Sequence, residues 1–253
     1  MFKKLLAAVG IGGATIETTL DQDEVEIGGT LTGTIRIQGG SLAQTIAEVT
    51  VELITVMHRE EDGHSRRQVV PIGRSPVAGP LEVAPGEVVE VGFSVGIPPA
   101  TPVSASEATA VWLRSALDIA MVADPADQDA ITILPPPVMR DVFAVMEEDL
   151  DLRLAQSDLE PVRGWGGGLP FVQEWEFRPN RRGTGLDEVE LVFHPTETGY
   201  DLMIQIDRAA RGLGGLLREA SGFDESWRRL RLGGGLEGPG RAAIAAALRE
   251  ALR

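Results

Sequence analysis

The feature that most constrains the fold is a period-two alternation of apolar and polar side chains, which recurs along most of the chain. In the segment LPFVQEWEFRP, Phe171, Trp175 and Phe177 fall on one face. Glu174 and Glu176 fall on the opposite face. This alternation is typical of a half-buried strand. We interpret the aromatic face as the packed side of a sheet, with a docking surface as the alternative.

The same alternation predicts at least six strands between residues 14 and 134. Examples are TLTGTIRIQGG, AEVTVELITV and VVEVGFSVGIPP, and Asp62-Gly63 between two such segments is a strong hairpin signal. Turn residues separate the strands at intervals typical of sandwiches. We therefore predict a β-sandwich domain over residues 1–134.

A second domain is predicted over residues 135–253. Three consecutive prolines begin it, and since proline can open a helix but cannot continue a strand ladder, we predict a linker helix over 135–150. The strand period then returns. Apolar residues at helical spacing predict a further helix over 208–221 and a C-terminal helix over 240–252.

Composition excludes several functional classes. The chain has no cysteine and three histidines, which removes disulfides, thiolate metal sites and cysteine nucleophiles. Its formal charge is -15, so its net field repels phosphate backbones. We predict no cofactor and no nucleic-acid partner.

The segment DPADQD holds the only metal-like group of carboxylates that the sequence suggests. Asp124, Asp127 and Asp129 could supply oxygen ligands to a hard cation, but their spacing is not that of an EF-hand. Aspartates in tight turns also accept hydrogen bonds from backbone N–H groups. We favour this turn role and keep the three residues as candidates for a metal site.

Catalytic interpretations lack partners in the sequence. GGSLA, around Ser41, approximates the start of a nucleophile elbow, but Ala43 stands where that motif needs glycine. His58, His64 and His194 have no recognisable triad context. We predict that the protein is not an enzyme, and a hydrolase that uses Ser41 or the aspartates is the less favoured alternative.

The N-terminus suggests an interaction segment. It begins with Phe2, Lys3, Lys4, Leu5 and Leu6, and glycines interrupt the apolar run that follows. This pattern favours a short amphipathic turn over a secretory signal. Packing on the sandwich is the favoured role, and contact with a membrane surface is the alternative.

The basic pair Arg181-Arg182 suggests a second interaction site. Such clusters usually lie on a solvated face or pair with nearby acids. Docking of an acidic partner is the alternative.

Several segments together resemble one family. FKKLLAAVGIGGA, GTLTGTIRIQGG, LDIAMVADPADQDAI and LPFVQEWEFRP occur in this order, and the chain resembles the bacterial sporulation-control family usually called SpoOM. The resemblance implies a mainly β fold of two arrestin-like β-sandwich domains, with no established catalytic activity. It transfers no binding residues.

The function that follows from this resemblance is regulatory. We predict a cytoplasmic adaptor that binds protein partners in bacterial development or in cell-envelope and division control. Sheet edges and concave faces of such a fold suit strand addition by a partner peptide. A peripheral scaffold at the inner face of the membrane, anchored through the N-terminal segment, is the alternative.

Overall fold

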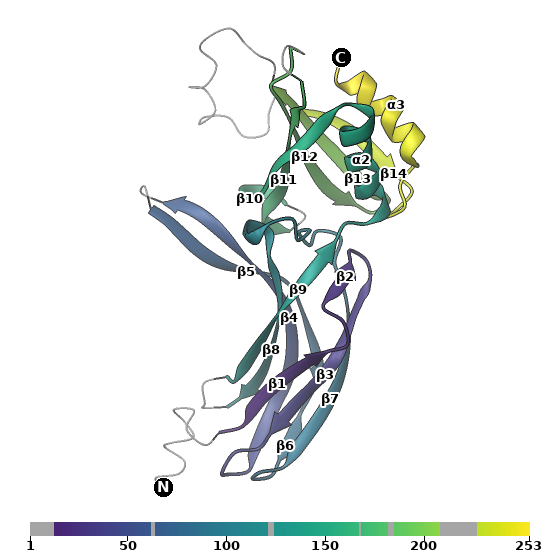
Figure 1. The fold of residues 1–253 in the computed structure, drawn as a ribbon. Helices are drawn as coiled ribbons and strands as arrows, with labels where there is room; N and C mark the ends of the chain where they lie inside the picture. The colour runs from purple at the N-terminus through teal and green to yellow at the C-terminus, as the bar shows by residue number, and fades with distance from the viewer. Residues whose placement is uncertain (1–12, 62–63, 121–123, 167, 182–184, 208–226) are drawn as a thin grey trace. The chain divides into compact units, whose positions relative to one another are not determined.

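The fold is mainly β and divides into two compact units (Figure 1). The computed structural model describes residues 13–61, 64–120, 124–166, 168–181, 185–207 and 227–253. The first unit comprises Met1–Val56, Glu60–Ser104 and Ala110–Leu134. The second comprises Met57–Arg59, Ala105–Thr109 and Pro135–Arg253.

The first unit contains two sheets. The smaller is antiparallel, in the order β1 (Thr15–Leu20), β3 (Thr30–Gln38), β7 (Val88–Gly96). The larger has the order β2 (Glu24–Glu26), β9 (Ala126–Leu134), β8 (Val111–Ile119), β4 (Gln44–Glu61), β5 (His64–Ala78), and β6 (Leu81–Val83) also pairs with β4. The strand β2 runs parallel to β9.

The core of the first unit follows the alternation in the sequence. Leu31, Ile35 and Ile37 of β3 are all completely buried. Val49 and Val51 of β4 are buried as well, as predicted. Thr50, which the alternation places on the outer face of β4, is also buried. A strand inside a sheet can lose solvent on both faces, and sequence alternation alone cannot show this.

The second unit has one antiparallel sheet with helices against one face (Figure 1). The sheet order is β10 (Leu152–Gly166), β11 (Leu169–Pro179), β12 (Glu188–Thr196), β13 (Gly199–Asp207), β14 (Trp227–Gly233). The helices are α2 (Pro137–Ala144), a π-helical turn η2 (Val145–Asp149) and α3 (Arg241–Ala251), and η1 (Glu107–Thr109) is a 3-10 turn.

The second unit differs from a two-sheet sandwich in its described residues. Helices occur at two of the three places where the sequence predicts them, after residue 135 and at the C-terminus, and they supply the layer opposite the sheet. They bury an apolar stripe that includes Val138, Val142 and Ile244. The helix predicted over 208–221 and the turn at 62–63 lie outside the described residues.

An aromatic cluster joins the helices to the sheet. The ring of Phe143 in α2 lies 4.6 Å from that of Trp175 and 5.8 Å from that of Phe193, measured between centroids. Phe171, Trp175 and Phe177 are nearly inaccessible to solvent. The aromatic face of LPFVQEWEFRP is therefore core, and the docking alternative is wrong for these three residues.

Ion pairs fix the end of η2 against α3. Arg241 Nη2 lies 2.6 Å from Glu148 Oε2 and 2.9 Å from Asp149 Oδ2, and Arg249 Nη2 lies 3.0 Å from Asp149 Oδ1. The hydrogen bond from Arg241 lowers the pKa of Asp149. The arrangement orients the C-terminal helix along the π-helical turn.

Truncation of Trp175 tests the aromatic cluster. We expect Trp175→Ala to lower the free energy of unfolding by about 3–5 kcal/mol, because it removes a large buried ring and leaves a cavity. Urea denaturation measures this. The control Arg153→Ala removes an exposed side chain of β10 and should change stability by less than about 0.5 kcal/mol. A loss below about 1 kcal/mol for Trp175→Ala would contradict the packing described.

Candidate functional site

One side of the first unit is closed because the chain crosses there from one sheet to the other. β1 lies at the edge of the smaller sheet and β2 at the edge of the larger, with only residues 21–23 between them. Asp21 N donates to Thr32 O at 3.0 Å in the smaller sheet. Thr132 N donates to Asp23 O at 2.7 Å in the larger sheet. This crossing connects the edges of the two sheets.

A buried polar group completes the closed side. The backbone N–H of Thr18 in β1 donates to Asp127 Oδ2 in β9 at 2.7 Å. The hydroxyls of Thr18 and Ser115 are hydrogen-bonded at 2.6 Å. Asp127 lies within β9 and not in a turn, but it does accept hydrogen bonds from backbone N–H groups: Gln128 N donates to its Oδ1 at 3.0 Å, and Thr18 N belongs to a strand 109 residues away.

The other two predicted aspartates differ from Asp127. Asp129 also lies in β9, and its buried Oδ2 has no hydrogen-bond partner in the described structure. Burial, with the nearby charge of Asp127, raises its pKa. Asp124 precedes β9 and accepts a long hydrogen bond from Ile119 N at 3.5 Å. Among the described residues, no three His, Cys, Asp or Glu side chains are placed to hold a metal ion.

The opposite side of the first unit is open. β5 and β7 are edge strands of different sheets, and in the described sheets they are not hydrogen-bonded neighbours. A hollow of ≈220 Å³, which we call the β5–β7 groove, lies between them. It is lined by Val51, Leu53, Gly73, Arg74, Ser75, Val95, Gly96, Pro98 and Leu113. Two edges that are unpaired in the described sheets and a lining with several aliphatic residues make it a candidate binding site for a peptide.

The rim of the groove is narrow and polar. A Cβ built on Gly73 would lie 3.6 Å from Pro98 Cγ, which is an ordinary contact, so Gly73 brings the two edges close. Arg74 beside it forms an ion pair with Glu48 of β4 at 3.1 Å. Both charged side chains are largely exposed, so this pair contributes little to stability and can be exchanged.

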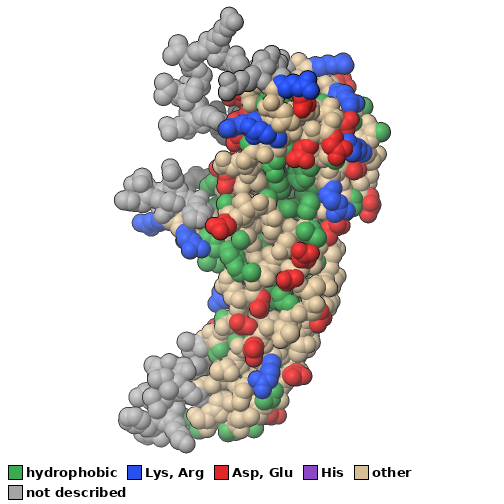
Figure 2. Space-filling model, viewed as in Figure 1, with side chains coloured by type: hydrophobic (Ala, Val, Ile, Leu, Met, Phe, Trp, Pro, Cys, Tyr) green, Lys and Arg blue, Asp and Glu red, His purple; other side chains and the backbone are tan. Residues whose placement is uncertain are grey.

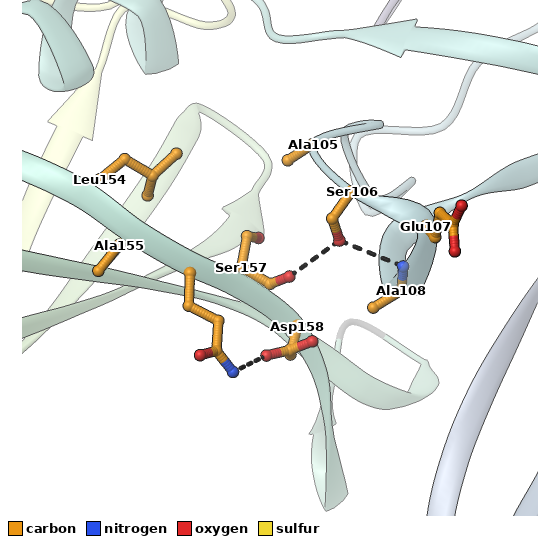
Figure 3. A pocket seen from close by; sticks show the side chains of 9 residues that line it. Ala105, Ser106, Glu107, Ala108, Leu154, Ala155, Ser157 and Asp158 are labelled. Atoms are coloured by element: carbon orange, nitrogen blue, oxygen red, sulfur yellow. Dashed lines mark hydrogen bonds between the residues drawn. The ribbon is translucent and has the colours of Figure 1, made fainter.

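A second hollow lies in the second unit, beside the edge strand β10 (Figure 3). Its volume is ≈450 Å³, and its lining includes Ser106, Leu154 and Ser157. The hydroxyl of Ser106 bonds Ser157 O at 3.3 Å, as Figure 3 shows. A break in register after Leu154 marks a bulge. The bulge and the hydrogen bond both obstruct further pairing with β10.

The two serines of this second hollow serve structural roles. Ser106 Oγ accepts a hydrogen bond from Ala108 N at 3.2 Å, and Ser157 Oγ accepts one from Gln173 Nε2 at 3.0 Å. Neither described contact involves a histidine or a carboxylate that could act as a base. The hollow therefore presents the exposed apolar side chain of Leu154 and no assembled catalytic group among its described contacts.

Of the predicted interaction residues, Arg181 is the one that the structure describes. Arg181 pairs with Asp151 at 2.9 Å, measured from Nε to Oδ2, and its side chain is 83% exposed. Asn180 also bonds this aspartate at 3.0 Å, so Arg181 belongs to an exposed cluster at one end of β11. Arg182 and the N-terminal Phe2, Lys3, Lys4, Leu5 and Leu6 lie outside the described residues. Ser41 is exposed between β3 and β4.

Comparison with known proteins assigns the family. The family model described as SpoOM protein matches residues 2–210. The chain belongs to the SpoOM family. It is 34% identical to the sporulation-control protein Spo0M of Bacillus subtilis strain 168 over 232 residues, which cover 91% of this chain and 89% of that protein.

A solved structure supports the same family. The crystal structure of Bacillus subtilis Spo0M superposes with a TM-score of 0.82 at 32% identity, over 95% of this chain and 98% of that chain. The family assignment and the mainly β fold predicted from the sequence are thereby confirmed. A regulatory role is supported at the level of the family. None of the described helices is long and apolar enough to cross a membrane.

Sequence reasoning did not identify the β5–β7 groove. Its lining combines residues from four strands, and Gly73 and Gly96 look like ordinary strand interruptions. The signal that could have drawn attention to β5 was its proline content. Pro71 and Pro76 in a strand pattern indicate an edge strand, because proline cannot donate to a ladder.

Replacement of Asp127 tests the closed side. We expect Asp127→Ala to lower the free energy of unfolding by about 1–3 kcal/mol, because the Thr18 N–H would lose its acceptor. Asp127→Asn keeps an acceptor oxygen, so its free energy of unfolding should fall by less. Urea denaturation at neutral pH compares the two. Equal losses in both variants would contradict a hydrogen-bonding role.

Asp129 makes stability depend on pH. Because its folded pKa is raised, the native state is favoured when Asp129 is protonated. This contribution is fully present below the unfolded pKa, about 3.9, and is lost as pH rises through the folded pKa. We expect Asp129→Asn to be more stable than the native protein at pH 7, with a difference that shrinks on acidification. Thermal unfolding at a series of pH values measures it, and a difference independent of pH would contradict it.

Proposed function

We propose that this protein is a non-enzymatic cytoplasmic regulator that acts by binding other proteins, in bacterial development or in cell-envelope and division control. The observation that carries the proposal is the open side of the first unit, where two unpaired sheet edges border an apolar groove. An extended segment of a partner can add to such an edge through backbone hydrogen bonds and place alternate side chains in the groove.

The contrast with two other edge strands, β1 and β10, supports this site. In the described structure, β1 is tied to β9 through Asp127, and β10 is obstructed by a bulge and by Ser106. Proteins commonly protect edges that would otherwise pair with other chains. An edge pair left open beside an apolar hollow is therefore a favourable place for a partner.

The chemistry of the hollows supports a binding role over a catalytic one. The side chains that line the β5–β7 groove are aliphatic, apart from Arg74 and Ser75. Nucleophilic catalysis needs a nucleophile, a base within hydrogen-bond reach and a group that orients the base. Ser75 has no such partner among the residues that line the groove.

A substitution that fills the groove tests the proposal. Gly73→Leu would extend a side chain toward Pro98, and Gly73 has no positive φ that a larger residue would strain. The matched control is Gly92→Leu on β7, at a position with open space around it and outside the groove. Both variants are checked for folding by thermal unfolding.

In-cell crosslinking followed by affinity capture and mass spectrometry gives the readout. We expect a defined set of proteins to be captured by the native chain and by Gly92→Leu, and to fall by about tenfold in Gly73→Leu, which corresponds to ~1.4 kcal/mol of lost binding energy. Capture of the same proteins in equal amounts by all three chains would show that the groove is not the binding site.

A further inference from the structure

β5 is a basic strand in an acidic protein. Its 15 residues, His64–Ala78, include Arg66, Arg67 and Arg74 and contain no Asp or Glu, whereas the whole chain has a formal charge of -15. Arg66 and Arg67 are exposed. Figure 2 shows basic side chains on the described part of the hairpin that β4 and β5 form. Of these arginines Arg74 lines the β5–β7 groove, and Arg66 and Arg67 lie seven and six residues before Gly73 on the same edge strand.

Like charges on an edge strand select its partners. Arginines on β5 repel the β5 strand of a second copy of this chain and so oppose pairing between two copies. The same arginines attract a strand that carries carboxylates. We infer that the open side of the first unit binds an extended, acidic segment of another protein, with an aliphatic side chain in the β5–β7 groove. This inference rests on the proposed function and names the chemistry of its partner.

The two faces of an added strand would meet different surroundings. Side chains of a strand alternate between faces, so one set would point toward Val51, Leu53 and Leu113 in the groove. The other set would lie on the outer face, beside Arg74 and its present partner Glu48. The matching ligand alternates aliphatic and acidic residues. A ligand carboxylate can replace Glu48 because the existing pair is exposed.

Two prolines limit how much of β5 can pair. Pro71 and Pro76 bracket the groove-lining residues 73–75, and neither has an N–H to donate. Backbone pairing at the groove is therefore short. Affinity must come largely from the aliphatic side chain in the groove and from the arginines. Substitutions at these positions therefore measure the two contributions to the affinity.

The negative charge of the whole protein does not oppose this local attraction. At physiological ionic strength, charges more than about 8 Å apart are largely screened. A ligand strand beside β5 lies about 4.8 Å from it, so Arg74 is the β5 charge that acts on the part of the ligand at the groove, and Arg66 and Arg67 act only on a ligand that extends along β5. Binding should weaken at high salt, because these charges are exposed.

The test uses a fluorescein-labelled peptide of alternating Glu and Leu residues and the full-length protein. Fluorescence anisotropy gives the dissociation constant. A peptide of alternating Lys and Leu has the same apolar pattern with the opposite charge, and we expect it to bind at least about tenfold more weakly, since several attractive pairs become repulsive. A Glu-Leu peptide with alternate backbone amides methylated should bind more weakly but not lose binding, because only a short part of the ligand pairs with the backbone of β5.

Variants of the protein separate the two parts of the site. Arg74→Gln should weaken the affinity for the Glu-Leu peptide about two- to fivefold, which is the effect of one exposed ion pair. Its control, Arg114→Gln, removes the same charge from β8, two strands farther from the ligand, and should not change the affinity. Gly73→Leu should abolish binding while Gly92→Leu retains it.

Each outcome decides a different statement. Preference for the Glu-Leu peptide, lost in Gly73→Leu and reduced in Arg74→Gln, supports the inference. Equal binding of both peptides, or preference for the Lys-Leu peptide, that is lost in Gly73→Leu overturns the acidic partner and leaves the proposed docking in the groove standing. Absence of binding by either peptide, or binding unchanged in Gly73→Leu, overturns the inference, and the capture experiment then decides the proposed function by itself.

Discussion

The hydrogen bond from the Thr18 N–H to the Asp127 carboxylate is the constraint on which the asymmetry of the first unit depends. β1 is an edge strand, and without an acceptor its buried N–H would cost free energy comparable to a lost hydrogen bond. Asp127 supplies that acceptor from the other sheet, so the two sheets are joined on this side. Asp129, two residues along the same face, has a buried oxygen with no hydrogen-bond partner among the described residues, and burial and the charge of Asp127 raise its pKa.

The opposite side of the first unit is the one at which we propose binding. β5 and β7 are the other two edges of these sheets, and the β5–β7 groove between them lies against buried core residues that include Val51, Leu53 and Leu113. The second unit uses a different solution: helices cover one face of its sheet, and Phe143 packs on Trp175, Phe177 and Phe193. The family relationship to Spo0M supports a regulatory role, and the open side of the first unit is where we propose that a partner binds.

Local patterns in the sequence predicted most of the strands, because side-chain burial in a sheet follows the period of the strand. They placed Phe171, Trp175 and Phe177 in the core and anticipated helices after residue 135 and at the C-terminus. The local patterns did not predict the role of a residue that contacts a strand far away in the sequence. Asp127 resembles a turn residue until β1 is placed beside β9, and Gly73 gains importance only because Pro98 lies opposite it. Contacts between strands far apart in sequence leave no periodic signal, so neither the closed side nor the groove could be predicted.

Residue-resolved hydrogen exchange tests the central claim, that one side of the first unit is closed and the other is open. Thr18 and the residues of β7 are all in edge strands of the same sheet, so they form an internal comparison. We expect slow exchange of the Thr18 amide, which is hydrogen-bonded to Asp127. We expect fast exchange of alternate amides of β7, whose N–H groups point away from β3. Fast exchange at Thr18, or equally slow exchange at every amide of β7, would contradict it.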